Sequence, residues 1–377
     1  MRVGFDAKRF FANFTGLGNY SRFVVSALSN QYPDDSFVLF SPKSNDQHPE
    51  LKPLLTRPNV TTIYPQGAYR YMKSLWRSYG MSVHPMMRSL DIFHGLSQEL
   101  PFGLKGVRKV VTVHDLIFLR FPQFYNPIDV AIYKTKVKAA CASADIVIAI
   151  SQQTADDLKT FFSVAEQKVR VVYQGCHPNF KREIGADERT AIREMYGLPD
   201  EYILSVGTIE ERKNVKIAVE AMGMMPASRR IPLVIVGKRT AYIEQVKQHA
   251  IRHGVIDNLV FIHNARFEDL PGIYQMATIF VYPSLFEGFG IPIVEAIESG
   301  LPVITSKGSC FSEAGGPSTL YFDPSNAEEL VAHLTTILDD QAFRAEVVSK
   351  SRKYISRFTP ERIASDLVRV YNDVLTF

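Results

Sequence analysis

The feature that most constrains the fold is an alternation of short β-branched runs with longer amphipathic segments, which occurs twice along the chain. In the first half, the runs Lys109–His114 and Asp145–Ile150 are separated by the helical pattern Ile128–Cys141. Strands that alternate with helices indicate βα units and a mostly parallel sheet covered on both faces. We therefore expect a doubly wound α/β domain. The other strands and helices expected in this half are Arg2–Asp6, Gly18–Asn30, Ser36–Ser41, Val60–Tyr64, Asp91–His94, Gln152–Phe162 and Lys168–Tyr173.

The alternation stops at the polar stretch Gln174–Asn179, which is followed by the charged run Lys181–Glu194. It restarts at the strand Tyr202–Gly207, and this restart predicts a second doubly wound domain. A chain of 377 residues is expected to hold two domains, which we place at residues 1–178 and 179–357. The further elements expected in the second domain are Asn214–Met224, Ile231–Gly237, Ala241–His253, Leu259–His263, Glu268–Met276, Thr278–Tyr282, Pro292–Ser299 and Pro302–Thr305.

The charge balance and the cysteines exclude several classes of protein. With 43 basic and 39 acidic residues the formal net charge is +4, which is too small an excess to indicate a nucleic-acid-binding protein. Three widely spaced cysteines, without a CxxC pair, argue against a disulfide framework or structural zinc, and we expect buried thiols. No apolar run approaches the ~18–20 residues that a spanning helix needs, and the N-terminus reads as a strand rather than a signal peptide. We expect a cytoplasmic protein.

The segment Glu287–Glu295 (EGFGIPIVE) combines three features of an anion site. Gly288 and Gly290 allow a ligand to approach the backbone, and a proline in the first helical turn leaves free N–H groups at the helix start. Glu287 and Glu295 can each accept hydrogen bonds from hydroxyl groups. Phosphates between two hydroxyl-bearing sugars describe a nucleotide sugar. The alternative is a Gly-Pro turn that starts an ordinary helix.

Arg212 and Lys213 follow the strand Tyr202–Gly207 and precede a helix whose N-cap we expect to be Asn214. An arginine and a lysine at such a position can neutralise a diphosphate and stabilise it as a leaving group. The alternative is a solvated loop pair whose charge is balanced by Glu210 and Glu211.

In this order and spacing, FEGFGIPIVEA preceded by VGTIEERKN closely resembles the retaining glycosyltransferases of family four. The resemblance runs through nearly the whole chain, because TGLGNYSR, VHDL, ADIVIAIS and YFDP match in register. It implies a GT-B fold: two Rossmann-like domains that face a cleft, with a C-terminal helix, residues 358–377, that crosses back to the N-terminal domain. We expect YFDP to follow the second sheet and Thr359 to cap the last helix.

The resemblance also implies roles for individual residues. Arg212 and Lys213 match the diphosphate-binding pair, Glu295 the carboxylate that holds the ribose hydroxyls, and Glu287 the one that contacts the donor sugar. Gly288, Phe289 and Gly290 match the loop whose backbone meets the sugar and phosphates. His114 matches a catalytic histidine near the reacting centre, and Gly16 and Gly18 match a flexible glycine loop after the first strand.

Read from the residues alone, some of these positions are less specific. His114 ends a strand, where a lone histidine is often structural. Gly16-Leu17-Gly18 resembles the opening of a dinucleotide fingerprint, but Ser21 stands where the third glycine should be, which disfavours a nicotinamide enzyme.

No Asp-x-Asp triplet occurs in the chain. We therefore expect no metal site and no cofactor beyond the nucleotide-sugar co-substrate, with Arg212, Lys213 and helix dipoles in place of a metal. The family's retention of configuration implies an oxocarbenium-like transition state with attack from the face the phosphate leaves. The opening DAKRF…TGLGNYSR is similar to bacterial O-antigen and capsule mannosyltransferases that use GDP-mannose. The alternatives are a transferase that uses a uridine-diphosphate sugar, a sugar-nucleotide 2-epimerase of the same fold, or a binding protein without turnover.

The expected partners besides the donor are a saccharide or a lipid-diphosphate-linked acceptor, bound by the N-terminal domain. The stretch Tyr69–Tyr79 predicts a basic amphipathic helix with the sole tryptophan, Trp76, on its apolar face. Such a helix favours contact with the inner face of an anionic membrane. The alternative is a helix packed on the sheet with its basic face in water.

Overall fold

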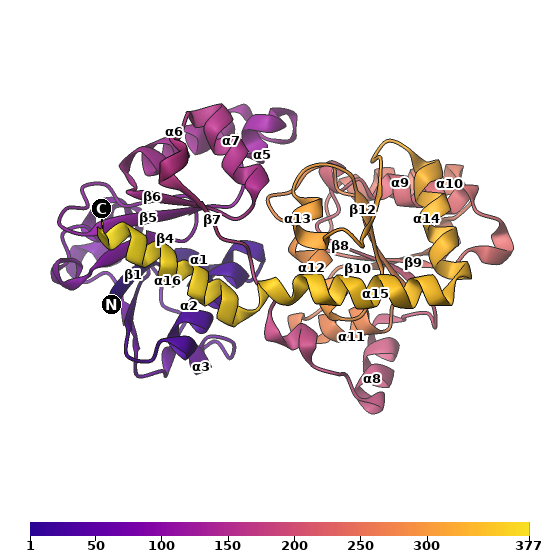
Figure 1. The fold of residues 1–377 in the computed structure, drawn as a ribbon, viewed down its shortest axis with the longest axis horizontal. Coiled ribbons are helices and arrows are strands. Elements are labelled where there is room, and N and C mark those ends of the chain that lie inside the picture. Colours follow the sequence, from indigo (N-terminus) through magenta and orange to yellow (C-terminus); the bar gives the residue numbers. More distant parts are fainter. Residues whose placement is uncertain (377) are drawn as a thin grey trace. The chain divides into compact units, whose positions relative to one another are not determined.

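The computed structural model describes residues 1–376, and the chain forms two compact units (Figure 1). Unit 1 comprises Met1–Gly175 and Phe358–Phe377, and unit 2 comprises Cys176–Arg357. The boundary follows Gly175 rather than residue 178. A Cβ atom on Gly175 would lie 2.0 Å from the Phe23 ring of unit 1, whereas Phe180 already packs on Tyr274 of unit 2, with ring centroids 5.4 Å apart.

The sheet of unit 1 has seven parallel strands in the order β3-β2-β1-β4-β5-β6-β7. Its strands coincide with the seven expected runs to within two residues at each end. Val3 of β1 pairs with Phe37 of β2 on one side and with Ile92 of β4 on the other. The strand order therefore changes direction between β1 and β4. The strands are β1 (Arg2–Asp6), β2 (Ser36–Phe40), β3 (Val60–Ile63), β4 (Ile92–Gly95), β5 (Arg108–Val113), β6 (Ile146–Ala149) and β7 (Val169–Val171).

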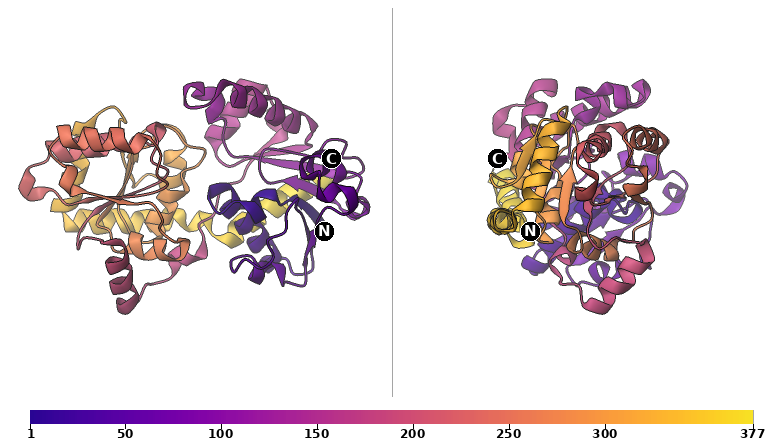
Figure 2. Two further views of the ribbon diagram at one scale, coloured as in Figure 1. Left: turned by 180° about the vertical axis from the view of Figure 1, so that it is seen from behind. Right: turned by 90° about the vertical axis from the view of Figure 1, so that its right-hand side faces the viewer.

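Helices cover both faces of this sheet, as Figures 1 and 2 show from several sides. On one face α16 (Pro360–Thr376) packs on α2 (Gly16–Gln31), with the short α1 (Lys8–Ala12) beside α2. On the other face α5 (Ile117–Arg120), α6 (Pro127–Ser143) and α7 (Gln152–Phe162) form a core with β5 and β6. Side-chain caps stabilise the N-termini of α7 and α16. Ser151 accepts a hydrogen bond from the Thr154 amide, and Thr359 accepts one from the Arg362 amide.

The segment expected as one helix over Tyr69–Tyr79 is broken into three turns. They are η1 (Gly67–Arg70), α4 (Lys73–Leu75) and the π-helical turn η2 (Trp76–Gly80). Trp76 is buried in a cluster with Phe40 and Phe93 rather than on an apolar surface stripe. The expectation of a continuous basic amphipathic helix is therefore wrong, whereas the burial of Trp76 against sheet residues agrees with the alternative of a segment packed on the sheet.

The sheet of unit 2 has six parallel strands in the order β10-β9-β8-β11-β12-β13. Five were expected, but the sixth was missed: Leu320–Phe322 pairs with β12, so Tyr321 and Phe322 of YFDP belong to the sheet and only Asp323 and Pro324 follow it. The three-residue run was too short to read as a strand. The strands are β8 (Ile203–Val206), β9 (Leu233–Val236), β10 (Leu259–Ile262), β11 (Ile279–Tyr282), β12 (Val303–Ser306) and β13 (Leu320–Phe322).

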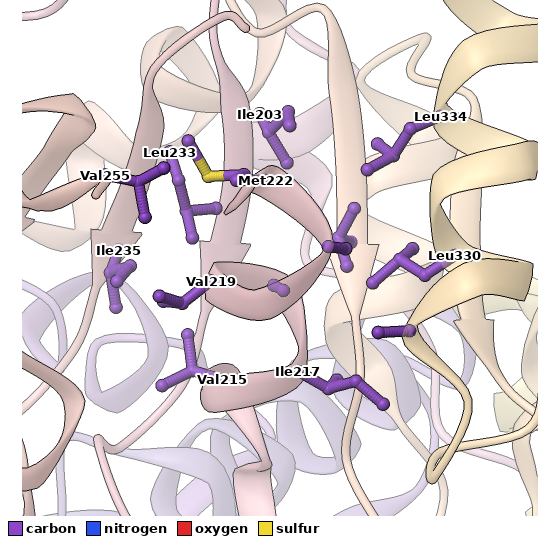
Figure 3. Close-up of a cluster of buried hydrophobic side chains, with 14 of the residues drawn as sticks. Ile203, Val215, Ile217, Val219, Met222, Leu233, Ile235, Val255, Leu330 and Leu334 are labelled. Atoms are coloured by element: carbon purple, nitrogen blue, oxygen red, sulfur yellow. The ribbon is translucent and has the colours of Figure 1, made fainter. Parts of the chain in front are cut away.

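A buried apolar cluster joins this sheet to α9 (Val215–Met224), α10 (Tyr242–Arg252) and α14 (Ala327–Asp339), as Figure 3 shows. The helices α11 (Leu270–Gln275), α12 (Ile291–Glu298), α13 (Phe311–Gly315) and α15 (Gln341–Ile355) pack together elsewhere in the unit, and α8 (Ala186–Tyr196) packs on α11. The three cysteines are buried free thiols, as expected. None of the helices within residues 1–376 is long and apolar enough to span a bilayer.

Candidate active site

Two loops of unit 2 meet at the carboxyl ends of neighbouring strands. One follows β8 and the other follows β11, and the Leu285 amide donates to the Arg212 carbonyl oxygen at 2.9 Å between them. Open parallel sheets bind ligands at this edge. The loops thus bring Arg212 and Lys213 to the segment that carries Glu287.

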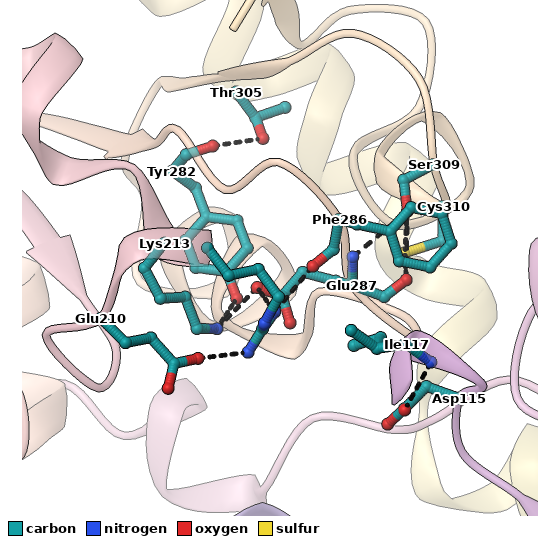
Figure 4. Close-up of polar contacts among 11 residues, drawn as sticks. Asp115, Ile117, Glu210, Lys213, Tyr282, Phe286, Glu287, Thr305, Ser309 and Cys310 are labelled. Carbon is teal, nitrogen blue, oxygen red and sulfur yellow. Dashed lines mark hydrogen bonds and ion pairs between the residues drawn. The ribbon is translucent and has the colours of Figure 1, made fainter. Parts of the chain in front are cut away.

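Lys213 and Glu287 form the centre of the cluster (Figure 4). The Lys213 ammonium donates to Glu287 Oε1 at 2.6 Å and to the Tyr282 hydroxyl at 2.9 Å, and it lies 5.1 Å from the centre of the Tyr282 ring. Its side chain passes over Gly207, from whose hypothetical Cβ it is 3.4 Å away. The lysine is therefore held by Glu287 and Tyr282.

Arg212 binds the same carboxylate. Its Nη1 lies 2.8 Å from Glu287 Oε1 and donates to the Phe286 carbonyl at 2.7 Å, while its Nη2 donates to Glu210 Oε1 at 2.7 Å. Its side chain is 13% exposed. The guanidinium thus ties the two loops together and is largely desolvated.

The two cations keep Glu287 ionised. Burial by itself would raise the pKa of the Glu287 carboxyl, but Lys213 and Arg212 outweigh burial and lower the pKa to about 2. The cluster contains two acids, Glu210 and Glu287, and two bases, Arg212 and Lys213, so its formal charges sum to zero. The positive ends of Arg212 and Lys213 are thereby held in place without a large local excess of charge.

The backbone of Glu287 is fixed by the loop after β12. The Glu287 amide donates to Ser309 Oγ at 3.2 Å, and the Glu287 carbonyl accepts from Ser309 Oγ at 3.1 Å and from Cys310 Sγ at 3.2 Å (Figure 4). Cys310 is fully buried beneath the loop. A third strand end therefore positions the carboxylate.

The glycine loop leads into α12. Gly290 immediately precedes the helix with φ of 92°, a conformation that favours glycine, and Pro292 lies in its first turn. Phe289 is buried, so this part of the loop presents backbone rather than an aromatic ring. Gly288 lies between Glu287 and Phe289. α12 thus begins within one residue of the expected position, and anion binding at this start stays a prediction.

Glu295 lies on α12, and the Tyr274 hydroxyl donates to its Oε2 at 3.1 Å. Burial raises the pKa of Glu295 to about 7, and the bond from Tyr274 offsets only part of that effect. The structure therefore places Glu295 outside the salt-bridged cluster, in a less polar setting of its own.

Asn214 occupies the expected N-cap position of α9, but its side chain does not cap the helix. It adopts a left-handed conformation with φ of 52° and makes no side-chain bond to the start of α9. Its side-chain amide instead donates to the Pro324 carbonyl at 2.9 Å. Asn214 is thus the N-cap residue of α9, as expected, and its carbonyl accepts from the Ile217 amide at 3.1 Å, while its side chain ties the turn to the segment after β13.

In unit 1, His114 follows β5 and is buried. Its Nε2 lies 2.8 Å from the Leu96 carbonyl, which can only accept, so this nitrogen carries the proton. Its Nδ1 accepts from the Gln174 side-chain amide at 3.3 Å. Burial lowers the pKa of His114 to about 4, so the ring is neutral at pH 7.

A buried polar network adjoins this histidine. The Tyr20 ring packs edge-on against His114 at 4.6 Å, and its hydroxyl is 3.2 Å from Thr112 Oγ1. His94 is 2.8 Å from Thr112 Oγ1 through Nε2 and 2.8 Å from the Tyr371 hydroxyl through Nδ1. The C-terminal helix α16 is thereby linked through His94 of β4 to Thr112 of β5, the strand that leads to His114.

Gly16 and Gly18 belong to the first turn of α2, not to a loop. A Cβ on Gly18 would lie 1.6 Å from the Asn13 carbonyl oxygen, whereas one on Gly16 would meet nothing within 4 Å. The expectation of a flexible glycine loop is therefore corrected. Gly18 permits close packing of α2 on the preceding turn, and Gly16 is open.

Unit 1 also contains a pocket of about 410 Å³ at the carboxyl ends of β1 and β2. Arg77 lies on its wall, bonded to Asp6 at 2.6 Å and also to Glu99, so the expected solvent-facing basic face is wrong for Arg77. The basic lining residues outnumber the two acidic ones: Lys8, Lys43, Lys73, Arg77, Lys109 and Lys136.

The structure thus joins Arg212, Lys213 and Glu287 directly, places Glu295 and Gly288–Gly290 in the same unit, and places His114, Gly16 and Gly18 in the other. Sequence reasoning missed Tyr282, Tyr274 and Gln174. Tyr282 and Tyr274 gave no signal because aromatic residues in apolar runs read as core. Gln174 was noted only as part of a linker.

Comparison with known proteins matches two family models. Residues 16–180 match the model described as glycosyltransferase family 4, and residues 188–354 the model of glycosyl transferases group 1. The chain is a glycosyltransferase similar to those of family four. The two models meet near the observed boundary between the units.

Relatives agree with this assignment. The relative called O-antigen chain mannosyltransferase B, from Escherichia coli, is 26% identical over 98% of this chain and 99% of its own length. The serotype-specific mannosyltransferase WbdA of Escherichia coli is 29% identical over 89% of this chain, which spans 43% of that relative. This glycosyltransferase therefore resembles bacterial O-antigen mannosyltransferases.

A solved structure gives the fold. HepE of Anabaena, crystallised with UDP, superposes with a TM-score of 0.73 at 17% identity, over 99% of this chain and all of that one. This likeness establishes the GT-B fold of the glycosyltransferase: two parallel α/β sheets of seven and six strands.

Proposed function

We propose that this glycosyltransferase moves a mannosyl group from GDP-mannose onto a saccharide or lipid-linked saccharide in surface polysaccharide synthesis, with retention of configuration and without a metal at the reacting centre. The observation that carries the proposal is the desolvated cluster of Arg212, Lys213 and Glu287 beside the start of α12. The names of the O-antigen relatives support the mannosyl group.

The cluster provides charges of both signs where a sugar diphosphate reacts. Negative charge develops on the leaving phosphate, and Arg212 and Lys213 offset it. Positive charge develops at the sugar C1, and Glu287, whose pKa of about 2 keeps it ionised, offsets that charge. The leaving phosphate accepts the proton of the acceptor hydroxyl as that hydroxyl attacks from the same face.

Three further contacts position the substrates in this proposal. Glu295 accepts from the ribose hydroxyls, and the backbone of Gly288, Phe289 and Gly290 meets the sugar and phosphates. His114 Nδ1 accepts a hydrogen bond from a hydroxyl of the donor sugar, in place of the bond from the Gln174 amide. Because its ring is neutral, His114 acts as a hydrogen-bond partner rather than as a cation.

The pocket of unit 1 is the proposed acceptor site. Its excess of basic residues suits an acceptor that carries phosphate, as a lipid-diphosphate-linked saccharide does. Tyr71, Met72 and Leu75 lie exposed next to Lys73. An apolar surface beside a cation suits contact with the cytoplasmic face of an anionic membrane.

A panel of ligands tests the donor. GDP-mannose and GDP should raise the melting temperature of the full chain more than UDP-glucose and UDP at equal concentration, because a ligand stabilises the state that binds it. A larger shift with the uridine nucleotides would replace GDP-mannose by the second candidate, a UDP-sugar, which the UDP-bound neighbour favours. Anomeric analysis of the product tests retention, and free epimerised sugar nucleotide without acceptor would point to a 2-epimerase.

A further inference from the structure

One side-chain cluster of unit 2 lies outside the proposed reaction. Glu220 on α9 faces His249 on α10, with Glu220 Oε2 at 3.8 Å from His249 Nε2. His253 follows one helical turn after His249, and the two rings are 4.5 Å apart between centroids. One donor atom from each of the three side chains lies within 4.8 Å of the others. We propose that Glu220, His249 and His253 bind a Zn²⁺ ion that links α9 to α10.

The donor set suits this ion. Zinc takes imidazole nitrogen at about 2.0–2.1 Å and carboxylate oxygen at about 2.0–2.2 Å, and two histidines with one carboxylate is an established combination. Histidines four residues apart lie on the same side of a helix. Side-chain rotations that draw the three donors about 1 Å closer complete the site and leave a fourth position for water.

Two local features favour ligation over ordinary packing. His249 Nε2 is buried and has no hydrogen-bond partner, which is costly for a polar atom unless a ligand engages it. Gly223 of α9 permits the close approach of His253, since a Cβ at Gly223 would lie 2.8 Å from that of His253 and 3.1 Å from its Nδ1. The second histidine therefore rests directly on the helix that carries the carboxylate.

Some charged groups around the cluster favour the binding of a cation and others oppose it. The carboxylate of Glu220, 3.8 Å from His249 Nε2, attracts a cation to the cluster. Arg252 Nη2 lies 3.3 Å from His249 Nδ1 and can only donate. Zinc at Nε2 moves the ring proton to Nδ1, so the exposed Arg252 has to turn away. Lys216 on α9 also repels a cation.

The site is separate from the donor cluster. Lys213 precedes α9, and Glu220 lies five residues beyond Val215, where the helix begins; at 1.5 Å per residue this is about 7 to 8 Å along the helix. The inference therefore goes beyond the proposed function: the ion holds α9 and α10 together without taking part in transfer.

Zinc titration of the full chain, stripped of metal with EDTA, tests the proposal. We expect one equivalent of Zn²⁺ to bind and to raise the melting temperature, with Co²⁺ producing the visible bands of a four-coordinate site. Glu220→Gln and His253→Ala should each weaken Zn²⁺ binding by roughly tenfold or more, because each removes a ligand. Arg252→Gln should tighten it severalfold.

His48→Ala is the matched control, a histidine of unit 1 outside the cluster, and should leave zinc affinity unchanged. Glu220→Gln changes a partly exposed side chain and should fold, which circular dichroism without metal verifies. Absence of zinc binding in the parent chain, or equal affinity in the parent, Glu220→Gln and His253→Ala, would overturn the proposal.

Discussion

Gln174 donates its side-chain amide to Nδ1 of His114 and so occupies the only lone pair that this neutral histidine offers. Gln174 lies next to Gly175, the last residue of the first segment of unit 1. A sugar hydroxyl that binds His114 has to replace this amide. The residue just before the unit boundary therefore competes with the proposed substrate contact.

Gln174→Ala should lower the KM for the donor by a few fold and leave kcat nearly unchanged. The physical reason is that a long neutral hydrogen bond, worth about 0.5–1 kcal/mol, no longer has to be broken. His114→Ala should instead lower kcat, because it removes the contact itself. Steady-state kinetics of both variants tests this, and a fall in kcat for Gln174→Ala would show that Gln174 orients the ring rather than competing for it.

Lys213→Ala should weaken GDP binding by about 1–3 kcal/mol through loss of a charge-assisted bond to phosphate. Calorimetric titration of GDP measures the effect. Lys216→Ala is the matched control, a lysine three residues further along whose ammonium binds Gln245 at 2.9 Å. Equal affinities for GDP in parent and Lys213→Ala would contradict the proposed donor site.

Glu287→Gln should abolish most transfer activity and reduce the stability of unit 2 by about 2 kcal/mol or more at pH 7. The substitution leaves the desolvated Arg212 and Lys213 without their shared counter-charge. An unpaired buried charge lowers the free energy of unfolding more than removal of the whole ion pair does. The folded pKa of about 2 is below the ordinary value of 4.5, so this stabilisation is present above pH 4.5 and is lost as the pH falls toward 2. Urea unfolding at pH 7 and pH 3 should show the parent losing its advantage over the variant.

The contribution of Glu295 to stability should depend on pH in the opposite way to that of Glu287. Its pKa of about 7 in the folded chain exceeds the ordinary value of 4.5, so the folded state binds more protons between these values. The free energy of unfolding of the parent should therefore fall as the pH rises from 4.5 to 7. Relative to the parent, that of Glu295→Gln should increase by about 1–3 kcal/mol between pH 5 and pH 8.

Donor affinity gives an independent measure of Glu295. Ribose hydroxyls donate to the ionised carboxylate, so GDP should bind the parent more tightly at pH 8 than at pH 6. In Glu295→Gln this difference should shrink. A parent whose unfolding energy and GDP affinity are both flat over this range would show that Glu295 is already ionised at pH 6.

The sequence predicted most of the fold because periodicity is a local signal. Runs such as Lys109–His114 alternate with helices so regularly that twelve of thirteen strands were expected, and only Leu320–Phe322 was too short to recognise. The stretch around Trp76 failed for the opposite reason. Its pattern fits a surface helix, but tertiary packing draws Trp76 into the core and Arg77 between two carboxylates.

The candidate site divides in the same way. Arg212, Lys213 and Glu287 could be named from their motifs, because each motif lies within a few residues of a strand end. The tyrosines that bind Lys213 and Glu295 could not, since Tyr282 contacts Lys213 across 69 residues of sequence and Tyr274 contacts Glu295 across 21. Nothing local distinguishes such a tyrosine from one in an apolar core.

The two glycines of α2 provide a test that separates folding from binding. Gly18→Ala should destabilise unit 1 by about 3 kcal/mol or more, because the new methyl group would lie 1.6 Å from the Asn13 carbonyl and the helix would have to move. Gly16→Ala meets no neighbour and should change stability by less than about 1 kcal/mol, with alanine favoured in the helix. Urea unfolding of both variants measures these effects, and equal stabilities would contradict the close packing of α2. The folded Gly16→Ala chain then reports on function alone. If the backbone here meets the donor, its KM rises while its unfolding midpoint stays that of the parent, and an unchanged KM would remove Gly16 from the donor site.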